Sequence, residues 1–193
     1  QHINNFFDKK QIKKSGQKKK FNVFFVGRFV ESKDPIFFLK NMIKILDKID
    51  VRIYLLGEGN LGPKLKVIST KYKKDIKFLK FINKPFNKYH KKIDLLCITS
   101  KFDGTPNVLG EGISYSIPCI APKNVGLANI LLKNGKGGHL YTQGNDKSFQ
   151  NTVVFALKNY KKTINKTKIA SKTIDNFSKK KTLGKLIFLI SRL

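Results

Sequence analysis

Short apolar runs alternate with amphipathic segments along most of the chain, and this alternation limits the fold more than any other feature of the sequence. Residues 21–26 (FNVFFV) form a continuous apolar run followed directly by Gly27, which is typical of a buried parallel strand that ends in a loop. Similar runs predict strands at residues 51–56, 76–81, 95–98 and 118–121, and a last edge strand within residues 135–141. The alternation therefore predicts an α/β fold with a doubly wound, Rossmann-like parallel sheet.

The segments between the strands carry helix signals. Asp34 can cap a helix that has Pro35 at its first position, and Ile36, Leu39 and Ile43 then fall on one face. Further helices are predicted at residues 61–72, from Pro85, from Pro106, and at residues 147–160 and 182–192. The 193 residues suffice for one core, so residues 21–193 are predicted to form a single domain with a C-terminal closing helix, and residues 1–20 a basic interdomain linker.

The chain is strongly basic. It has 40 Lys and Arg against 12 Asp and Glu, a formal net charge of +28, which raises nucleic acid or an anionic membrane as a partner. The basic residues are all lysine except Arg28, Arg52 and Arg192. We interpret the lysine runs chiefly as solvated surface, with peripheral contact to an anionic membrane as a secondary interpretation and no specific nucleic acid as partner.

The sequence also bears on location and redox state. No apolar run approaches the roughly 20 residues needed to cross a bilayer, and the polar N-terminus lacks a signal-peptide apolar region. Cys97 and Cys119 each lie inside an apolar run, which suits buried, reduced thiols better than a disulfide or a metal site. A cytoplasmic protein is therefore expected.

The loops that follow the strands are the places to look for a ligand site, because ligands of such sheets lie beyond the carboxyl ends of the strands. The first loop, GRFVESK, places Arg28 and Lys33 just before a helix. Two cations there can hold a diphosphate, Arg28 through a planar fork and Lys33 as a point charge. An ion pair between Arg28 and a carboxylate is the alternative.

The loop after the fourth strand, SKFDGTPNVLGEG, has the richest chemistry. Gly104 permits a tight or left-handed turn, and a helix beginning at Pro106 would leave N–H groups at its start for an anion. Asp103 lies at the lip, and Glu111 follows a little over two helical turns later, so both can accept hydrogen bonds from hydroxyls. The alternatives are that Asp103 caps the helix and Glu111 is a solvated helix residue. The backbone N–H groups that could meet an anion at the start of this helix belong to Thr105, Asn107 and Val108.

Several motifs occur in a fixed order along nearly the whole chain: VGRF followed by a lysine, LLGEG, FLKFI, DLLCITS, DGTPNVLGEG and IPCIAP. Together they resemble the C-terminal domain of the group 1 retaining glycosyltransferases, relatives of glycogen synthase and sucrose synthase. The resemblance implies one half of a two-domain glycosyltransferase B-type fold. It also implies transfer of a hexose-type sugar from a UDP-, GDP- or ADP-sugar to a glycan or lipid-linked acceptor, as in polysaccharide biosynthesis, with no metal or other cofactor.

The family's acceptor-binding N-terminal domain precedes this segment and is not within these 193 residues. The domain alone is therefore expected to bind donor weakly and to transfer little or no sugar.

The resemblance assigns the phosphate end of the site to two loops. Gly27, Arg28 and Lys33 match the family's diphosphate-binding loop. Glu58 and Gly59 match the acidic-glycine loop beside it.

The sugar and nucleoside contacts are assigned in the same way. Asp103 and Glu111 match the family's paired acidic residues, so that Asp103 would contact the donor sugar and Glu111 the ribose hydroxyls. The amides of residues 104–108 would contact sugar and phosphate, and Phe81 and Ile82 stand where the family lays the nucleotide base.

The chain departs from the family pattern at four positions. Asp103 is one methylene shorter than the usual glutamate, Gly112 stands where alanine is usual, Ser116 where glycine is usual, and Asn129 where glutamate is frequent. These departures bear on the sugar contacts more than on the nucleotide site.

The sequence gives less support to a dinucleotide site, a nucleic-acid-binding surface or a metal site. GEGNLG (residues 57–62) is formally a dinucleotide-binding G-x-G-x-x-G, but the following strand lacks the acidic residue that would take the ribose hydroxyls. A basic nucleic-acid-binding module would interleave aromatic residues with its lysine runs, whereas the aromatic residues here lie in strands and amphipathic faces. The sequence has no D-x-D pair after a strand and no His/Cys cluster with metal-ligand spacing.

Overall fold

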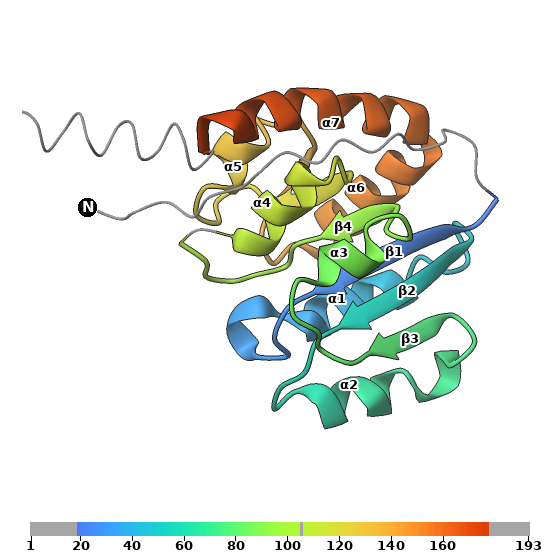
Figure 1. Ribbon diagram of the computed structural model, residues 1–193. Helices are drawn as coiled ribbons and strands as arrows, with labels where there is room; N and C mark the ends of the chain where they lie inside the picture. The colour runs from blue at the N-terminus through green and yellow to red at the C-terminus, as the bar shows by residue number, and fades with distance from the viewer. Residues whose placement is uncertain (1–18, 105, 178–193) are drawn as a thin grey trace, which may run out of the picture.

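The computed structural model describes residues 19–104 and 106–177, and these form a six-stranded parallel sheet with helices on both faces (Figure 1). The spatial order is β3-β2-β1-β4-β5-β6, with every neighbouring pair parallel. The order reverses between β1 and β4, which creates the crevice where ligands of such sheets bind. The predicted doubly wound sheet is confirmed. The strands are β1 (Phe21–Val26), β2 (Val51–Leu56), β3 (Ile76–Leu79), β4 (Leu95–Cys97), β5 (Cys119–Pro122) and β6 (His139–Tyr141).

Two layers of helices cover the sheet. Apolar side chains of α1 (Pro35–Ile43), α2 (Gly62–Ile68) and α6 (Asp146–Lys158) pack on one face. Side chains of α3 (Pro85–Tyr89), α4 (Asn107–Ser114), α5 (Ala128–Leu131) and the C-terminal part of α7 (Tyr160–Ile174) pack on the other. Short 3-10 turns lie at Glu31–Lys33, Thr70–Tyr72 and Asp175–Phe177.

The alternation of side chains along each strand divides the core in two. Val23 and Phe25 point to the α1 side, whereas Phe24 and Val26 point to the α4 side. The cysteines follow the same rule: Cys97 in β4 is part of the core on the α1 side, and Cys119 in β5 belongs to the core on the α4 side. Both thiols are free and buried, as expected from the sequence.

The C-terminal part of the fold differs from the sequence-based prediction. The described chain continues from α6 into α7, a 15-residue helix that the sequence did not reveal. The buried positions of α7 have helical spacing but are occupied by small or polar side chains such as Thr163, Thr167 and Ser171, so no apolar stripe marks the helix. The predicted closing helix at 182–192 and all of the predicted linker except residues 19 and 20 lie outside the described residues.

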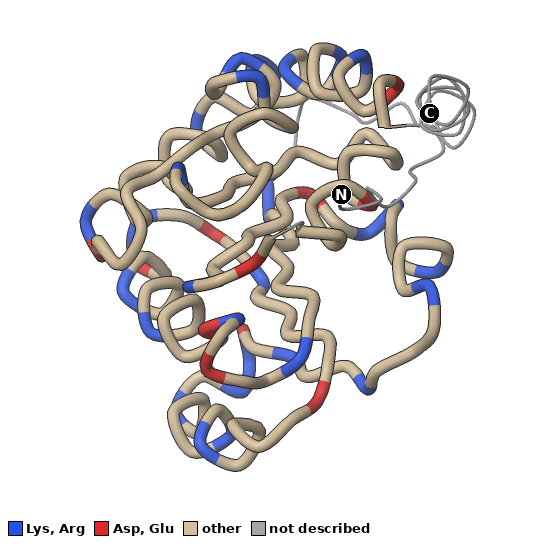
Figure 2. The backbone as a smooth tube through the Cα atoms, turned by 90° about the vertical axis from the view of Figure 1, so that its left-hand side faces the viewer, with Lys and Arg blue, Asp and Glu red and all other residues tan. Residues whose placement is uncertain are grey.

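The lysine residues of the described part of the chain are spread over its surface (Figure 2). Lys and Arg lie on helices and loops throughout the view in Figure 2 and do not gather on one face. This distribution supports the interpretation of the lysines as solvated surface. Within the described ranges, no helix has the length and apolar character that crossing a bilayer requires.

Candidate functional site

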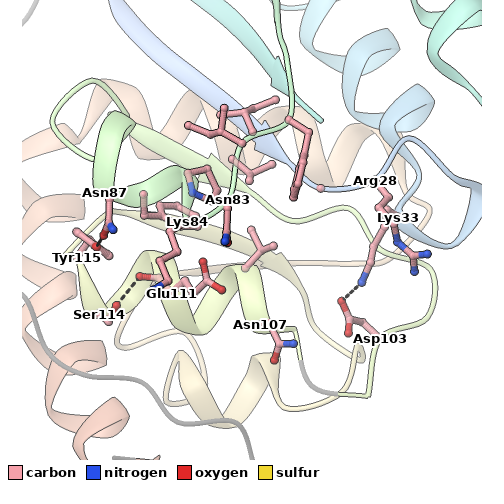
Figure 3. A pocket seen from close by; sticks show the side chains of 18 residues that line it. Arg28, Lys33, Asn83, Lys84, Asn87, Asp103, Asn107, Glu111, Ser114 and Tyr115 are labelled. Carbon is pink, nitrogen blue, oxygen red and sulfur yellow. Dashed lines mark hydrogen bonds and ion pairs between the residues drawn. The ribbon is translucent and has the colours of Figure 1, made fainter. Parts of the chain in front are cut away.

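A cavity of about 680 Å³ opens at the carboxyl ends of the strands, at the point where the strand order reverses. The ends of β1 and β2 form its floor, the segment after β3 with α3 forms one wall, and α4 forms the other (Figure 3). The lining side chains come from segments up to 89 residues apart in the chain, from Val26 to Tyr115. They are Val26, Gly27, Arg28, Lys33, Leu56, Phe81, Ile82, Asn83, Lys84, Pro85, Phe86, Asn87, Asp103, Asn107, Val108, Glu111, Ser114 and Tyr115.

Most of the residues proposed from the sequence meet in this cavity. Those that line it are Gly27, Arg28, Lys33, Phe81, Ile82, Asp103, Asn107, Val108 and Glu111. Glu58, Gly59, Gly104 and Pro106 do not line it, and Thr105 lies outside the described residues. The side chains assigned to diphosphate, sugar, ribose and base are therefore brought to one place.

The cationic end of the cavity is built by the loop after β1. Arg28 and Lys33 both line this end, and the Lys33 ammonium forms an ion pair with the Asp103 carboxylate (Figure 3). Arg28 is exposed and makes no ion pair with any residue of 19–104 or 106–177. The alternative of a structural ion pair at Arg28 is thus not seen in this part of the chain. Its guanidinium is available to an anionic ligand.

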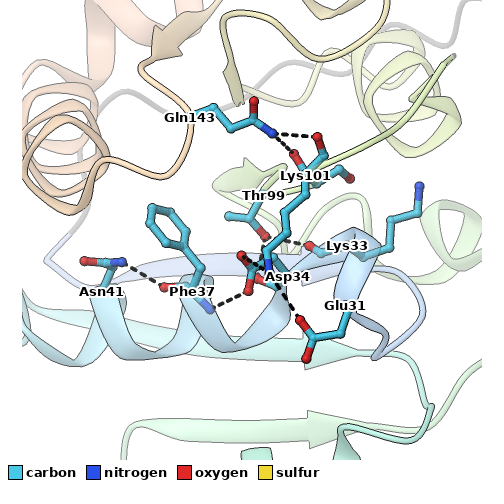
Figure 4. A network of polar contacts seen from close by, with 9 residues as sticks. Glu31, Lys33, Asp34, Phe37, Asn41, Thr99, Lys101 and Gln143 are labelled. Carbon is cyan, nitrogen blue, oxygen red and sulfur yellow. Dashed lines mark hydrogen bonds and ion pairs between the residues drawn. The ribbon is translucent and has the colours of Figure 1, made fainter.

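A network of polar contacts fixes the backbone at Lys33 (Figure 4). The Thr99 hydroxyl, at the end of β4, donates to the carbonyl oxygens of Lys33 and Asp34 at 3.0 and 3.1 Å. Asp34 caps α1 as predicted, accepting a hydrogen bond from the Phe37 amide at 3.1 Å. Lys101 pairs with Asp34 at 3.6 Å and with the neighbouring Glu31 at 3.2 Å. The loops after β1 and β4 are therefore held as one unit.

The glycine-rich loop after β2 supports the Arg28 loop through backbone contact. A Cβ at Gly57 would lie 1.9 Å from the carbonyl oxygen of Gly27, and the Phe29 amide donates to the Glu58 carbonyl at 2.8 Å. A Cβ at Gly59 would lie 2.6 Å from the Phe29 carbonyl oxygen. Glu58 and Gly59 are exposed. In this structure they shape the Arg28 loop and do not line the cavity.

The start of α4 forms the opposite wall. Pro106 is the N-cap and no side chain of the described residues caps the helix, so Asp103 does not have the capping role considered as its alternative. Glu111 is half-buried in the wall, and burial raises the pKa of its carboxyl above the ordinary 4.5. It is not a fully solvated helix residue. Gly104 has no positive φ, so of the tight or left-handed turn that the sequence permits at this position, the left-handed form is not adopted.

Nine lining residues were not singled out as site residues by the sequence, and five of them have polar side chains. Asn83 and Lys84 follow β3, Asn87 belongs to α3, and Ser114 and Tyr115 end α4. The Tyr115 hydroxyl donates to the Asn87 side-chain oxygen, which joins α3 to α4 across one end of the cavity. Asn83 and Lys84 lie in the loop after β3, where a ligand contact could have been sought, but nothing local pointed to the others.

The structure accounts for one departure from the family pattern, Gly112, and shows why glycine is usual at a second, Ser116. A Cβ at Gly112 would lie 2.5 Å from the Leu96 side chain, so Leu96 fills the space that an alanine methyl group would need. Ser116 has a φ of +54° in the turn that ends α4. The Ile117 amide donates to the Gly112 carbonyl and the Ser116 amide to that of Ile113, the Schellman pattern, in which glycine is favoured at the position of Ser116.

Metal ligands do not gather in the described part of the chain. Residues 19–104 and 106–177 contain no group of three His, Cys, Asp or Glu side chains placed to hold a metal ion. The charges that face a ligand in the cavity are carried by protein side chains, namely those of Arg28, Lys33, Lys84, Asp103 and Glu111.

Comparisons with known proteins agree with one another. The sequence profile of the family "Glycosyl transferases group 1" matches residues 20–159. Granule-bound starch synthase 1 of Triticum aestivum is 27% identical over 121 residues, which cover 61% of this chain and 20% of that protein. Lipopolysaccharide 1,6-galactosyltransferase of Salmonella typhimurium is 41% identical over 54 residues, which cover 28% of this chain and 15% of that protein.

Among solved structures, Anabaena HepE in complex with UDP and glucose has a TM-score of 0.80 at 20% identity. The superposition covers 91% of this chain and 49% of HepE. The chain thus has the fold of one half of that protein, and it spans a fifth or less of the two curated relatives.

Proposed function

The chain belongs to the group 1 glycosyl transferases, and from this membership we propose that its cavity binds the donor of a retaining glycosyl transfer, a nucleoside diphosphate sugar. One observation carries the proposal. Arg28 and Lys33 stand at one end of a single cavity, and Glu111 lies farther along it, where the strand order reverses. Such a cavity offers cations to a diphosphate and a carboxylate to the hydroxyls of a nucleoside.

The phosphate end rests on two side chains. Arg28 donates to the diphosphate through its planar fork, and Lys33 adds a second positive charge. As the bond between sugar and phosphate breaks, negative charge grows on the departing diphosphate, and these two cations stabilise it without a metal ion. The network that fixes the Lys33 backbone, together with the ion pair to Asp103, positions the Lys33 side chain before the donor arrives.

The sugar and the nucleoside occupy the α4 side. Asp103 accepts from a hydroxyl of the donor sugar, and Glu111 accepts from the ribose hydroxyls. The amides at the start of α4 lie near sugar and phosphate. The base lies against Phe81 and Ile82; Phe81 is 58% exposed, which leaves its ring available for such a contact.

The acceptor is bound elsewhere. The chain covers 49% of HepE, and we propose that a second domain supplies the acceptor site, a glycan or a lipid-linked sugar, so that these 193 residues transfer little sugar alone. The complex of HepE with UDP makes a uridine donor the first choice for testing. The buried, reduced thiols of Cys97 and Cys119 suit a cytoplasmic location, and peripheral contact of the lysine-rich surface with an anionic membrane is part of the proposal.

A ligand panel tests the function. UDP-, GDP- and ADP-sugars are added to the 193-residue chain and the melting temperature is measured, because a ligand that binds only the folded state raises it. We expect one nucleotide series to raise the melting temperature and Arg28→Ala to abolish the rise. The control is Lys158→Ala, which also removes one exposed positive charge; Lys158 ends α6 close to Tyr160, whose ring packs on Phe21 at the start of β1, away from the cavity. No rise with any nucleotide, or an equal rise in Arg28→Ala, overturns the proposal.

A further inference from the structure

The loop after β5 supports the site from behind. Gly126 in this loop has a φ of +47°, and a Cβ at this position would lie 2.1 Å from the carbonyl oxygen of Asp103 and 2.3 Å from that of Gly104. Both neighbours are backbone atoms, which cannot rotate aside as a flexible side chain would. The two loops therefore touch backbone to backbone, and a side chain at position 126 must separate them.

The Gly126 loop cannot retreat easily from this contact. Val125 is 2% exposed and Ala128 is fully buried, so the residues on both sides of Gly126 are fixed in the core. The Ala128 amide donates to the Val125 carbonyl at 3.0 Å, which closes the turn around Gly126. An added side chain would therefore move the Asp103 loop more readily than its own.

The Asp103 loop is held on its other side by the first loop of the site. The Asp103 carboxylate pairs with Lys33, and the Lys101 amide donates to the Ser32 carbonyl at 2.8 Å. Asp103 therefore has two neighbours: its carboxylate contacts the Lys33 ammonium, and its backbone carbonyl lies against Gly126. Displacement of its backbone at residues 103 and 104 would shift the carboxylate with it.

We propose that Gly126 is a positioning residue for the donor sugar: the absence of a side chain at this position sets where the Asp103 carboxylate stands. This inference rests on the proposed function, in which Asp103 contacts the sugar. Arg28 and Glu111 are carried by the loop after β1 and by α4, whereas the atoms nearest to a Cβ at Gly126 belong to Asp103 and Gly104. A change at Gly126 should therefore weaken the sugar contact and leave the contacts to diphosphate and ribose in place.

Calorimetry on the 193-residue chain separates these contacts. The dissociation constants of UDP, GDP and ADP are compared with those of their glucose, galactose and N-acetylglucosamine conjugates, and the ratio measures what the sugar adds. We expect both Gly126→Ala and Asp103→Ala to bring that ratio to about one, while the diphosphate still binds. Gly144→Ala is the matched control, because Gly144 also has a positive φ (+69°) but a Cβ there would meet nothing within 4 Å.

A second measurement needs no ligand. Backbone amide exchange of residues 100–104, 107 and 108 should accelerate in Gly126→Ala and stay at the wild-type rate in Gly144→Ala. Unchanged exchange overturns the positioning role, and so does a sugar contribution that survives in Gly126→Ala or is absent from the wild type. If the wild type binds no nucleotide at all, the proposed function fails, and the sugar role fails with it whatever the exchange rates show.

Discussion

The ion pair between Lys33 and Asp103 leads to an unexpected prediction: removing the charge of Asp103 should increase the affinity for a nucleoside diphosphate. In the proposed site Lys33 serves the diphosphate, yet its ammonium is engaged by the Asp103 carboxylate when no donor is bound. Asp103→Asn keeps the size of the side chain and removes its charge. Lys33 is then left unneutralised, and a repulsive charge near the phosphates is lost. The variant should therefore bind the bare nucleoside diphosphate more tightly than the wild type.

The size of the effect follows from the burial of the pair. The side chains of Lys33 and Asp103 are 26% and 14% exposed, so the pair is better shielded than surface pairs, which contribute about 0–1 kcal/mol. Two unit charges at 4 Å interact by about 4 kcal/mol at an effective dielectric constant of 20, before the cost of desolvation is subtracted. We expect a net gain of about 1–2 kcal/mol, a 5- to 30-fold lower dissociation constant for the diphosphate.

Titration calorimetry with UDP, GDP and ADP measures this gain, which should shrink as salt is added because the charges are partly exposed. Asp146→Asn is the matched control: Asp146 pairs with Lys44 at 2.6 Å on the outer side of α1 and α6, and both side chains are about half exposed. An unchanged or weaker affinity of Asp103→Asn for every diphosphate, in a variant that melts like the wild type, would show that Lys33 does not serve the phosphates.

Three further predictions concern single side chains. Burial raises the pKa of Glu111, and the ribose hydroxyls need its ionised form, so donor affinity should rise with pH through that pKa. Calorimetry on Glu111→Gln should show no such dependence on pH. A dependence that persists in the variant removes the ribose assignment. His139 is 7% exposed, and burial lowers its pKa to about 4 from 6.5. Between pH 4 and 6.5 the unfolded chain therefore binds more protons than the folded one, and up to about 3 kcal/mol of stability is lost as pH falls through this range. Urea unfolding of His139→Gln should lack this part of the slope, and an identical pH profile contradicts the assignment. Ser116→Gly should raise the free energy of unfolding by about 0.5–1 kcal/mol, because glycine relieves the left-handed strain at a modest entropic cost; a lower value would show that the serine side chain stabilises the turn.

The sheet could be predicted because its signals are local. Each buried parallel strand is a short apolar run of its own, and Asp34 with Pro35 marks the start of α1 within two residues. The helix α7 was not predicted, because most of its buried positions are threonine, serine or alanine and the helix depends on the neighbouring helices for its stability.

Many residues of the candidate site could be predicted from the sequence, but the contacts between the loops that carry them could not. The rule that ligands bind at the strand ends placed Arg28, Lys33, Asp103 and Glu111 together, and they line one cavity. The pairing of Lys33 with Asp103 joins residues 70 positions apart and depends on the conformations of two loops. The close approach of Gly126 to residues 103 and 104 is of the same kind. Such contacts leave no periodic trace in the sequence.

The two buried cysteines can be used to measure local opening of the fold on each face of the sheet. Cys97 and Cys119 lie on adjacent strands in the middle of the sheet but face opposite layers of helices, and burial holds the pKa of the Cys97 thiol well above its ordinary value. An alkylating reagent needs an exposed thiolate, so neither cysteine should react until the layer above it lifts. The rates at which the two become labelled therefore measure separately how often each side of the sheet opens in the folded protein.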